Sequence, residues 1–160
     1  MAAPDPELLD DLRELQRCGT AVALLAVNRD ITPVHVSKVT SDRQVRKVLS
    51  SIIRIYSDSM WSSYGSEGSA SADGRLHREH IVPVRVLVDR LIMNPGESDE
   101  IFGSVVLADV TPEEHKRLGH IWKDHEDLYA EMLACEPSEL LALGLRRYDR
   151  GGVRVDEYLF

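Results

Sequence analysis

Cysteine is scarce in this sequence, and long apolar runs are absent. The two cysteines, Cys18 and Cys135, stand far apart and outside any CxxC spacing, which argues against a thiol redox centre or a cysteine-built zinc site. Both are predicted to be small, buried apolar residues. No window approaches the roughly 18 apolar residues of a membrane-spanning helix, and the first residues lack the basic and then apolar pattern of a secretion signal. The chain is therefore expected to be soluble and cytoplasmic, with no membrane association.

An excess of positive charge is absent as well, since 27 acidic residues outnumber 19 Lys and Arg. The formal net charge is −8, which argues against general nucleic-acid affinity because phosphate contacts need clustered Lys and Arg. The charge is unevenly spread, since residues 38–92 are net positive whereas residues 93–160 carry a large excess of acid. The middle segment is thus the place to look for contact with an acidic partner.

The length and composition predict one domain over residues 1–160, because 160 residues with 43% hydrophobic side chains can bury a core. Helical spacing of apolar residues predicts a short first helix near residues 4–18 and another over 41–56. The apolar run 20–27 fits either a buried strand or a buried helix. Residues 1–56 therefore form a helical N-terminal part.

The next segment, residues 57–74, is rich in Ser and Gly and is predicted to be a long loop that carries Trp61 and Tyr64. Apolar spacing after Pro83 then predicts a helix to Met93. Residues 104–110, "SVVLADV", are typical of a strand.

The clearest local signal is "TPEEH". Thr111 is the predicted N-cap of a helix, Pro112 its first residue and Glu114 the partner that completes a capping box. The pattern places His115 in the first turn of one helix that runs on to Met132.

The C-terminal part, residues 120–160, is predicted to contain the rest of that helix and a second short helix capped by Ser138. A Gly-Gly turn then precedes a terminal strand or hairpin. The expected fold class is α+β, a mostly helical single domain with a small β component.

Chemistry is expected from "EHIVP", residues 79–83, because a carboxylate and an imidazole here precede the imidazole of His115. Together these segments resemble the HNH, or ββα-metal (His-Me finger), endonuclease motif over residues 75–119. The resemblance implies a finger-like core in which His80 is the general base. It implies Glu79 and His115 as ligands of a divalent ion such as Mg²⁺, Mn²⁺, Ni²⁺ or Zn²⁺.

One position departs from the family pattern. Such motifs usually carry an Asn near the start of the second strand, and Val106 stands there in this sequence. Asn94 and Asp109 are the candidates to replace it, and His77 is a further candidate for a phosphate or metal contact.

The resemblance implies a nuclease that hydrolyses DNA, with RNA as the other substrate, in phage defence or restriction. Phosphate contacts are expected from basic residues of the net-positive segment: Arg43, Arg46, Lys47, Arg54, Arg75, Arg78 and Arg85.

Two other functions stay open. One is a catalytically degenerate finger that serves as a protein-interaction or regulatory subunit, as a homodimer or through its acidic C-terminal segment. The other is a helical regulatory domain without a metal. Metal binding would separate the nuclease and the degenerate finger from the metal-free regulatory domain. Hydrolysis would separate the nuclease from the degenerate finger.

Overall fold

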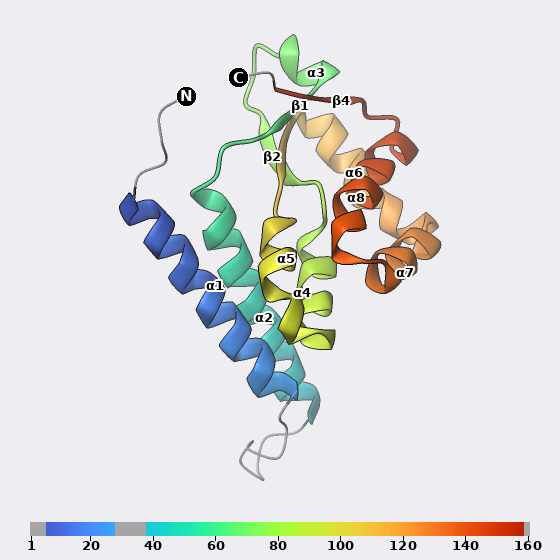
Figure 1. Ribbon diagram of the computed structural model, residues 1–160. Helices are drawn as coiled ribbons and strands as arrows, with labels where there is room; N and C mark the ends of the chain where they lie inside the picture. Colours follow the sequence, from blue (N-terminus) through green and yellow to red (C-terminus); the bar gives the residue numbers. More distant parts are fainter. Residues whose placement is uncertain (1–5, 28–37, 159–160) are drawn as a thin grey trace.

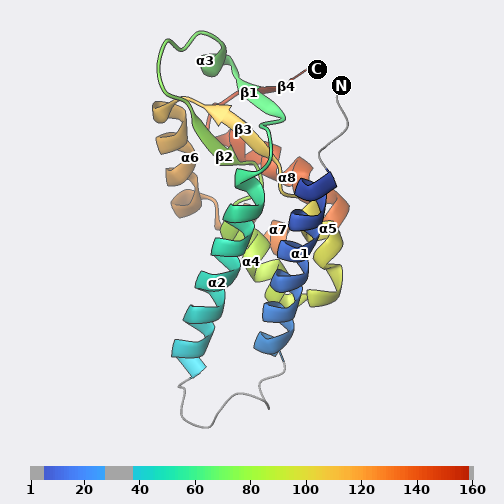
Figure 2. The same ribbon diagram turned by 90° about the vertical axis from the view of Figure 1, so that its left-hand side faces the viewer.

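Two long helices lead the chain in the computed structural model, which describes residues 6–27 and 38–158. Helices α1 (Pro6–Val27) and α2 (Lys38–Asp58) lie side by side (Figures 1 and 2). The apolar run whose structure the sequence left open is therefore helical, as the last turns of α1. On α2 the buried stripe is centred on Leu49 and Ile53. Val48, an apolar residue of the helix predicted over 41–56, is 46% exposed and lies outside this stripe.

A small four-stranded sheet caps one end of the helices (Figure 1). Its strands are β1 (Tyr64–Ser66), β2 (His77–His80), β3 (Leu107–Val110) and β4 (Val155–Glu157), in the order β2-β3-β1-β4. The β1 and β3 strands are parallel, and the other two neighbouring pairs are antiparallel. The molecule is thus a mostly helical α+β domain in which β2 is an edge strand.

The prediction of a long loop over residues 57–74 is wrong. The segment contains strand β1 and a short helix, α3 (Glu67–Ala70), capped by the Ser66 hydroxyl. This three-residue segment has no apolar pattern and forms a strand because β3 and β4 pair with it on both sides. Gly65 also permits a close approach, since the Tyr158 ring occupies the space where a Cβ would stand.

Between β2 and β3 the chain forms α4 (Val84–Met93), the 3₁₀ turn η2 (Pro95–Glu97) and α5 (Ser98–Gly103). The start of α4 directly after Pro83 confirms the helix predicted there. These helices pack against α1, α2 and α7 (Glu126–Ala134) around a helical core. Its fully buried members include Leu49, Leu87, Leu91 and Phe102.

The predicted helix from Thr111 to Met132 is two helices. α6 (Pro112–Asp124) ends at His125, whose φ of −136° and ψ of 55° leave the helical region before α7 begins. Ser138 is not the cap of the next helix, because it lies inside the 3₁₀ turn η3 (Pro137–Glu139). Glu136 and Glu139 form a reciprocal capping box there, and α8 (Leu140–Arg150) follows.

A second, smaller core lies between the sheet and the helices α6 and α8. It contains Ala108 and Val110 of β3, Leu118 of α6 and Tyr148 of α8. The terminal strand predicted after the glycine pair is confirmed as β4, and Gly152 supplies the turn with a φ of 62°.

The two cysteines do not behave as buried residues. Cys18 is exposed on α1, and Cys135 is only partly buried after α7. Position 18 falls on the solvent side of α1, whereas Gly19 and Ala23 face its packed side. Within the described helices, none combines the length and apolar character needed to cross a bilayer.

Candidate functional site

The edge strand β2 presents the predicted site residues on its two faces, because successive side chains in a strand alternate. Glu79 lies opposite Ala108 and His77 lies opposite Val110. This is the face that α6 and α8 cover, so Glu79 meets side chains from both helices. His80 and Arg78 lie on the other face, where both contact the C-terminal end of α2.

Glu79 joins three elements. One carboxylate oxygen, Oε2, lies 2.7 Å from Nδ1 of His115 on α6. The other, Oε1, accepts a 2.8 Å hydrogen bond from Nη2 of Arg147 on α8. Arg147 is 1% exposed, and the same Nη2 donates to the His80 carbonyl at 3.0 Å. A buried guanidinium thus holds the Glu79 carboxylate in place, while His115 approaches it from the solvent side.

The start of α6 fixes the position of His115. The predicted capping box is confirmed, with Thr111 Oγ1 accepting from the Glu114 amide and Glu114 accepting from the Thr111 amide at 2.8 Å. Glu114 also accepts a 2.6 Å hydrogen bond from Ser66 Oγ, which ties the helix to β1. Burial raises the pKa of Glu114, but these hydrogen bonds outweigh it and keep the pKa below its ordinary value.

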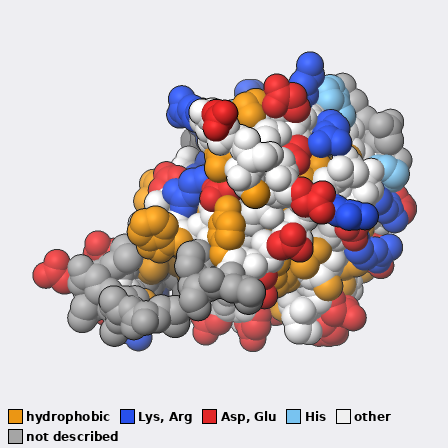
Figure 3. Space-filling model, turned by 90° about the horizontal axis from the view of Figure 1, so that it is seen from above, with side chains coloured by type: hydrophobic (Ala, Val, Ile, Leu, Met, Phe, Trp, Pro, Cys, Tyr) orange, Lys and Arg blue, Asp and Glu red, His pale blue; other side chains and the backbone are white. Residues whose placement is uncertain are grey.

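A second histidine lies beside this pair. The His77 and His115 rings stack with centroids 4.8 Å apart and an interplanar angle of 8°. Both residues are exposed. Figure 3 shows histidine side chains at one margin of the molecular surface, with Lys and Arg side chains beside them.

The donor set at this position suits a metal ion with two protein ligands. Among the described residues, no group of three or more His, Cys, Asp or Glu side chains is placed to hold a metal. Glu79 and His115 nevertheless supply one carboxylate and one imidazole, and each carboxylate oxygen keeps a second lone pair. Mg²⁺ prefers oxygen ligands, whereas an imidazole suits ions such as Zn²⁺ or Ni²⁺. A carboxylate with an imidazole is thus a donor pair of the second kind, which water and phosphate oxygens would have to complete.

His80 occupies a different environment. Its Nε2 lies 3.0 Å from Ser57 Oγ, and the Ser57 hydroxyl itself donates to the Arg54 carbonyl at 2.8 Å. A hydroxyl has a single hydrogen, so His80 Nε2 carries the proton and donates to Ser57. Nδ1 then keeps its lone pair. Burial lowers the pKa of His80 from 6.5 to about 4, with nearby Arg54 and Arg147 lowering it further against Glu79 and Asp58.

The three motif residues meet at one cavity of about 300 Å³. Because β2 has an open edge, side chains from both of its faces reach this cavity. Glu79, His80 and His115 line this cavity together with four arginines, which are Arg54, Arg78, Arg85 and Arg147. Pro83 and Val84 complete the lining. The site is therefore a basic hollow with one carboxylate.

Arg54 is central to this hollow. It lines the 300 Å³ cavity and two neighbouring ones of about 260 and 690 Å³. It is exposed, and no ion-pair partner for it occurs among the described residues. Its charge is thus available to an anionic ligand.

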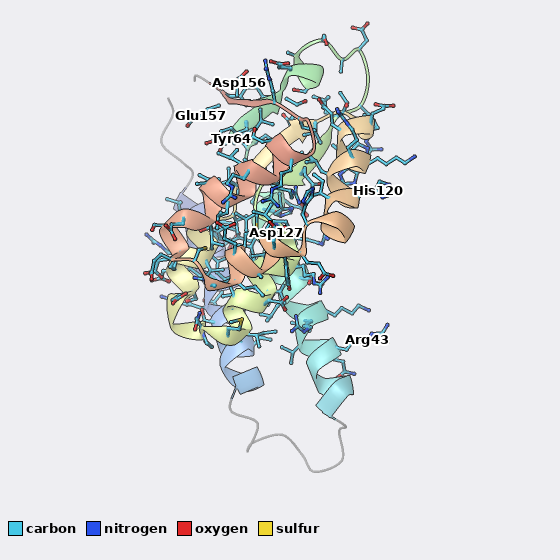
Figure 4. All side chains as sticks on the ribbon, turned by 90° about the vertical axis from the view of Figure 1, so that its right-hand side faces the viewer. Arg43, Tyr64, His120, Asp127, Asp156 and Glu157 are labelled. Carbon is cyan, nitrogen blue, oxygen red and sulfur yellow. The ribbon has the colours of Figure 1, made fainter. Side chains whose placement is uncertain are left out.

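The other basic residues predicted to contact phosphate either have partners within the protein or lie away from the cavities. Arg46 pairs with Asp89, and Arg85 lies 4.0 Å from the same carboxylate. The Arg78 guanidinium donates to backbone carbonyls at the end of α2, those of Ser57, Asp58 and Met60. The remaining three are exposed and line none of these cavities within the described structure: Arg43, Lys47 and Arg75. Arg43 projects from the end of α2 that is remote from the sheet (Figure 4).

Neither candidate for the family's middle Asn makes a hydrogen bond to His80 among the described residues. Asn94 ends α4 and begins η2. Asp109 accepts hydrogen bonds from Ser62 Oγ and Tyr158 OH at 2.7 and 3.2 Å. The side chain that holds the His80 ring is Ser57.

Sequence reasoning missed Ser57 and Arg147, because both lie outside the motif region. Each interrupts an apolar helical stripe. Ser57 follows Leu49 and Ile53 at helical spacing, and Arg147 follows Leu140 and Leu143. A polar residue on a buried stripe must find a partner in the core, and this signal points to both positions.

Comparisons of this chain with protein-family models, with curated proteins and with solved structures find no match.

Proposed function

We propose that the protein is a metal-dependent endonuclease of the HNH type that hydrolyses DNA in the cytoplasm, in phage defence or restriction. The observation that carries this proposal is the meeting of His80, Glu79 and His115 at one cavity, with Arg54 beside them and without an ion-pair partner in the described part of the chain. Hydrolysis of a phosphodiester needs a base for water and positive charge for the phosphate oxygens. The cavity has candidates for both.

The proposed chemistry begins at His80. Because its Nε2–H is held by Ser57 Oγ, the lone pair of Nδ1 accepts the proton of a water molecule. The water oxygen then attacks phosphorus, the bond from phosphorus to the leaving oxygen breaks, and that oxygen takes a proton from solvent while His80 returns its own to solvent. The lowered pKa of His80 keeps the imidazole neutral at neutral pH and leaves the Nδ1 lone pair free, and it also makes this imidazole a weaker base than an ordinary histidine.

Positive charge has two sources in this proposal. Arg54 faces the cavity without an ion-pair partner among the described residues and would contact a phosphate oxygen. A divalent ion held by Glu79 and His115 would supply Lewis-acid stabilisation of the developing negative charge. Arg147 positions Glu79 for that role without entering the chemistry.

The test is nicking of supercoiled plasmid DNA by the purified protein with Mg²⁺, Mn²⁺, Ni²⁺ or Zn²⁺, and with EDTA. Cleavage is expected only with metal, and His80→Ala should abolish it. Ser57→Ala should slow it by about tenfold or more, because a base that loses its orienting partner is misplaced. His120→Ala is the matched control, since His120 lies on α6 and is exposed (Figure 4). Cleavage that persists in His80→Ala protein would contradict the assignment.

The second candidate function is a non-catalytic finger that binds a protein partner. It is favoured by the Glu79 carboxylate, which already has Arg147 and His115 as partners and so needs no ion to be stable. Mn²⁺ titration followed by electron paramagnetic resonance tests the nuclease, which requires metal binding that Glu79→Gln weakens. Hydrolysis separates the two candidates, because protein that leaves DNA intact, with or without bound metal, would favour the non-catalytic finger.

A further inference from the structure

Trp61 is the most exposed large apolar side chain among the described residues, with 89% of its surface accessible. It stands on the rim of a cavity of about 570 Å³ that Glu79, His80 and His115 do not line. We call this cavity the Trp61 pocket, and six of its lining side chains matter for ligand binding: Asp58, Trp61, Ser62, Arg78, Asp109 and Tyr158. Two aromatic rings at one hollow offer flat faces on which a planar ligand can stack.

The charges of the pocket favour a base over a phosphate. Asp58 and Asp109 place two carboxylates in its wall, and Arg78 directs its guanidinium to the backbone carbonyls at the end of α2. A phosphate would be repelled by these carboxylates. The N–H groups of a nucleobase would be attracted to them, because a carboxylate only accepts hydrogen bonds.

Two hydrogen bonds fix the Asp109 carboxylate where it could accept a hydrogen bond from a nucleobase. Its Oδ1 accepts from Ser62 Oγ at 2.7 Å and its Oδ2 from Tyr158 OH at 3.2 Å. Each oxygen keeps a second lone pair for a ligand. Amino groups on cytosine, adenine or guanine can donate to it, as cytosine N4 does to Asp in direct readout. Thymine has no amino group, and its ring N–H lies between two carbonyl oxygens that the carboxylate repels.

The pocket also adjoins the proposed cleavage site. The 260 Å³ cavity between them shares Asp58 and Arg78 with the Trp61 pocket, and it is lined by Arg54 and His80. A strand whose base entered the pocket would therefore carry its backbone toward His80. Bases inside a duplex cannot enter such a hollow without leaving the stack.

We propose that this pocket binds an unpaired nucleotide with an exocyclic amino group, stacked on Trp61 and hydrogen-bonded to Asp109, in single-stranded DNA or in the locally unpaired strands of a supercoiled plasmid. The inference rests on the proposed nuclease function for the identity of its ligand. It also has consequences for binding that do not depend on cleavage.

The experiment measures fluorescence anisotropy of labelled oligo(dC), oligo(dT) and a blunt duplex with His80→Ala protein in EDTA, so that no strand is cut. Oligo(dC) should bind tightest. Adding Trp61→Ala should weaken oligo(dC) binding by about tenfold, since stacking of one base contributes about 1–3 kcal/mol, and Trp61→Phe should keep most of the affinity. Asp109→Asn should remove the preference for oligo(dC) over oligo(dT).

Ile55→Ala is the matched control, because Ile55 is also an exposed apolar side chain, at 52%, but lines none of the cavities described. Equal oligo(dC) affinity with and without Trp61, or a duplex bound as tightly as oligo(dC), would overturn the pocket assignment even if wild-type protein nicks plasmid. Trp61-dependent binding of oligo(dC), together with no cleavage of plasmid or oligo(dC) by the wild-type protein in the presence of metal, would uphold the pocket and reject the nuclease.

Discussion

At the scale of residues, the site depends on polar side chains whose partners are buried. Glu79 is held by Arg147, and His80 is held by Ser57. Arg147 and Ser57 are 1% and 3% exposed, so both interactions are shielded from water. Shielding makes each interaction strong and makes the loss of one partner costly.

His80 should make the stability of the fold depend on pH. Its pKa is about 4 in the folded protein, below the ordinary 6.5 expected in the unfolded chain. The unfolded state therefore binds more protons between these values, and stability falls as the pH falls from 6.5 to about 4. The loss is on the order of 2–3 kcal/mol. Urea unfolding at a series of pH values should show a shallower dependence for His80→Gln, and identical profiles would contradict the prediction.

The pair of Glu79 and Arg147 should show coupling in a double-mutant cycle. Arg147→Met leaves the carboxylate beside an apolar side chain, and breaking a buried pair in this way costs about 3–5 kcal/mol. Glu79→Gln in the same chain removes the unpaired charge and should restore part of the loss. Denaturant unfolding of the two single variants and the double variant measures the coupling, and simple additivity would rule it out.

At the scale of elements, the close approach of α8 to the end of β2 places Arg147 beside Glu79. Gly144 makes this approach possible, since a Cβ there would lie 2.9 Å from both the carbonyl oxygen and the Cγ2 of Ile81. The Ile81 carbonyl belongs to the backbone, so it cannot move away from an added Cβ as the end of a flexible side chain can. The small residue on α8 is thus a condition for the buried ion pair.

Gly144→Ala should therefore destabilise the protein by about 1–3 kcal/mol, the usual cost of overpacking. Gly119→Ala on α6 is the matched control, because nothing lies within 4 Å of its Cβ position. Alanine there should stabilise the helix by up to about 1 kcal/mol. Thermal unfolding of the two variants tests the contrast, which fails if both melting temperatures move in the same direction.

At the scale of the whole molecule, the proposed site lies where the two cores meet. Helix α2 from the helical core contributes Arg54 and Ser57, whereas α6 and α8 from the sheet core contribute His115 and Arg147. Strand β2 joins the two halves. The chain is acidic overall, with a net charge of −8, so any attraction for DNA must come from this local basic hollow.

DNA binding should consequently involve few phosphates and depend only modestly on salt. Arg54→Ala should reduce the slope of log K against log salt by about one unit and weaken binding to all sequences alike. Arg43→Ala, which removes an exposed charge from the remote end of α2 (Figure 4), should change neither. Anisotropy titrations over a range of salt concentrations compare the two. An equal effect of both substitutions would mean that binding follows total charge.

The sequence alone determined those features that depend on neighbours along the chain. The capping box fixed the start of α6 and put His115 in its first turn, because its hydrogen bonds link residues three positions apart. Periodicity identified α4 and the buried side of α2, since helical burial repeats with the turn of the helix.

Only the tertiary structure decided the features that depend on distant partners. Strand β1 has no apolar pattern and exists because β3 and β4 flank it. Ser57 and Arg147 reach the site from helices that lie far from the motif in sequence, and packing of the two cores brings them there. Local propensity determines where a helix starts, whereas the neighbours of a buried charge are set by how the elements pack.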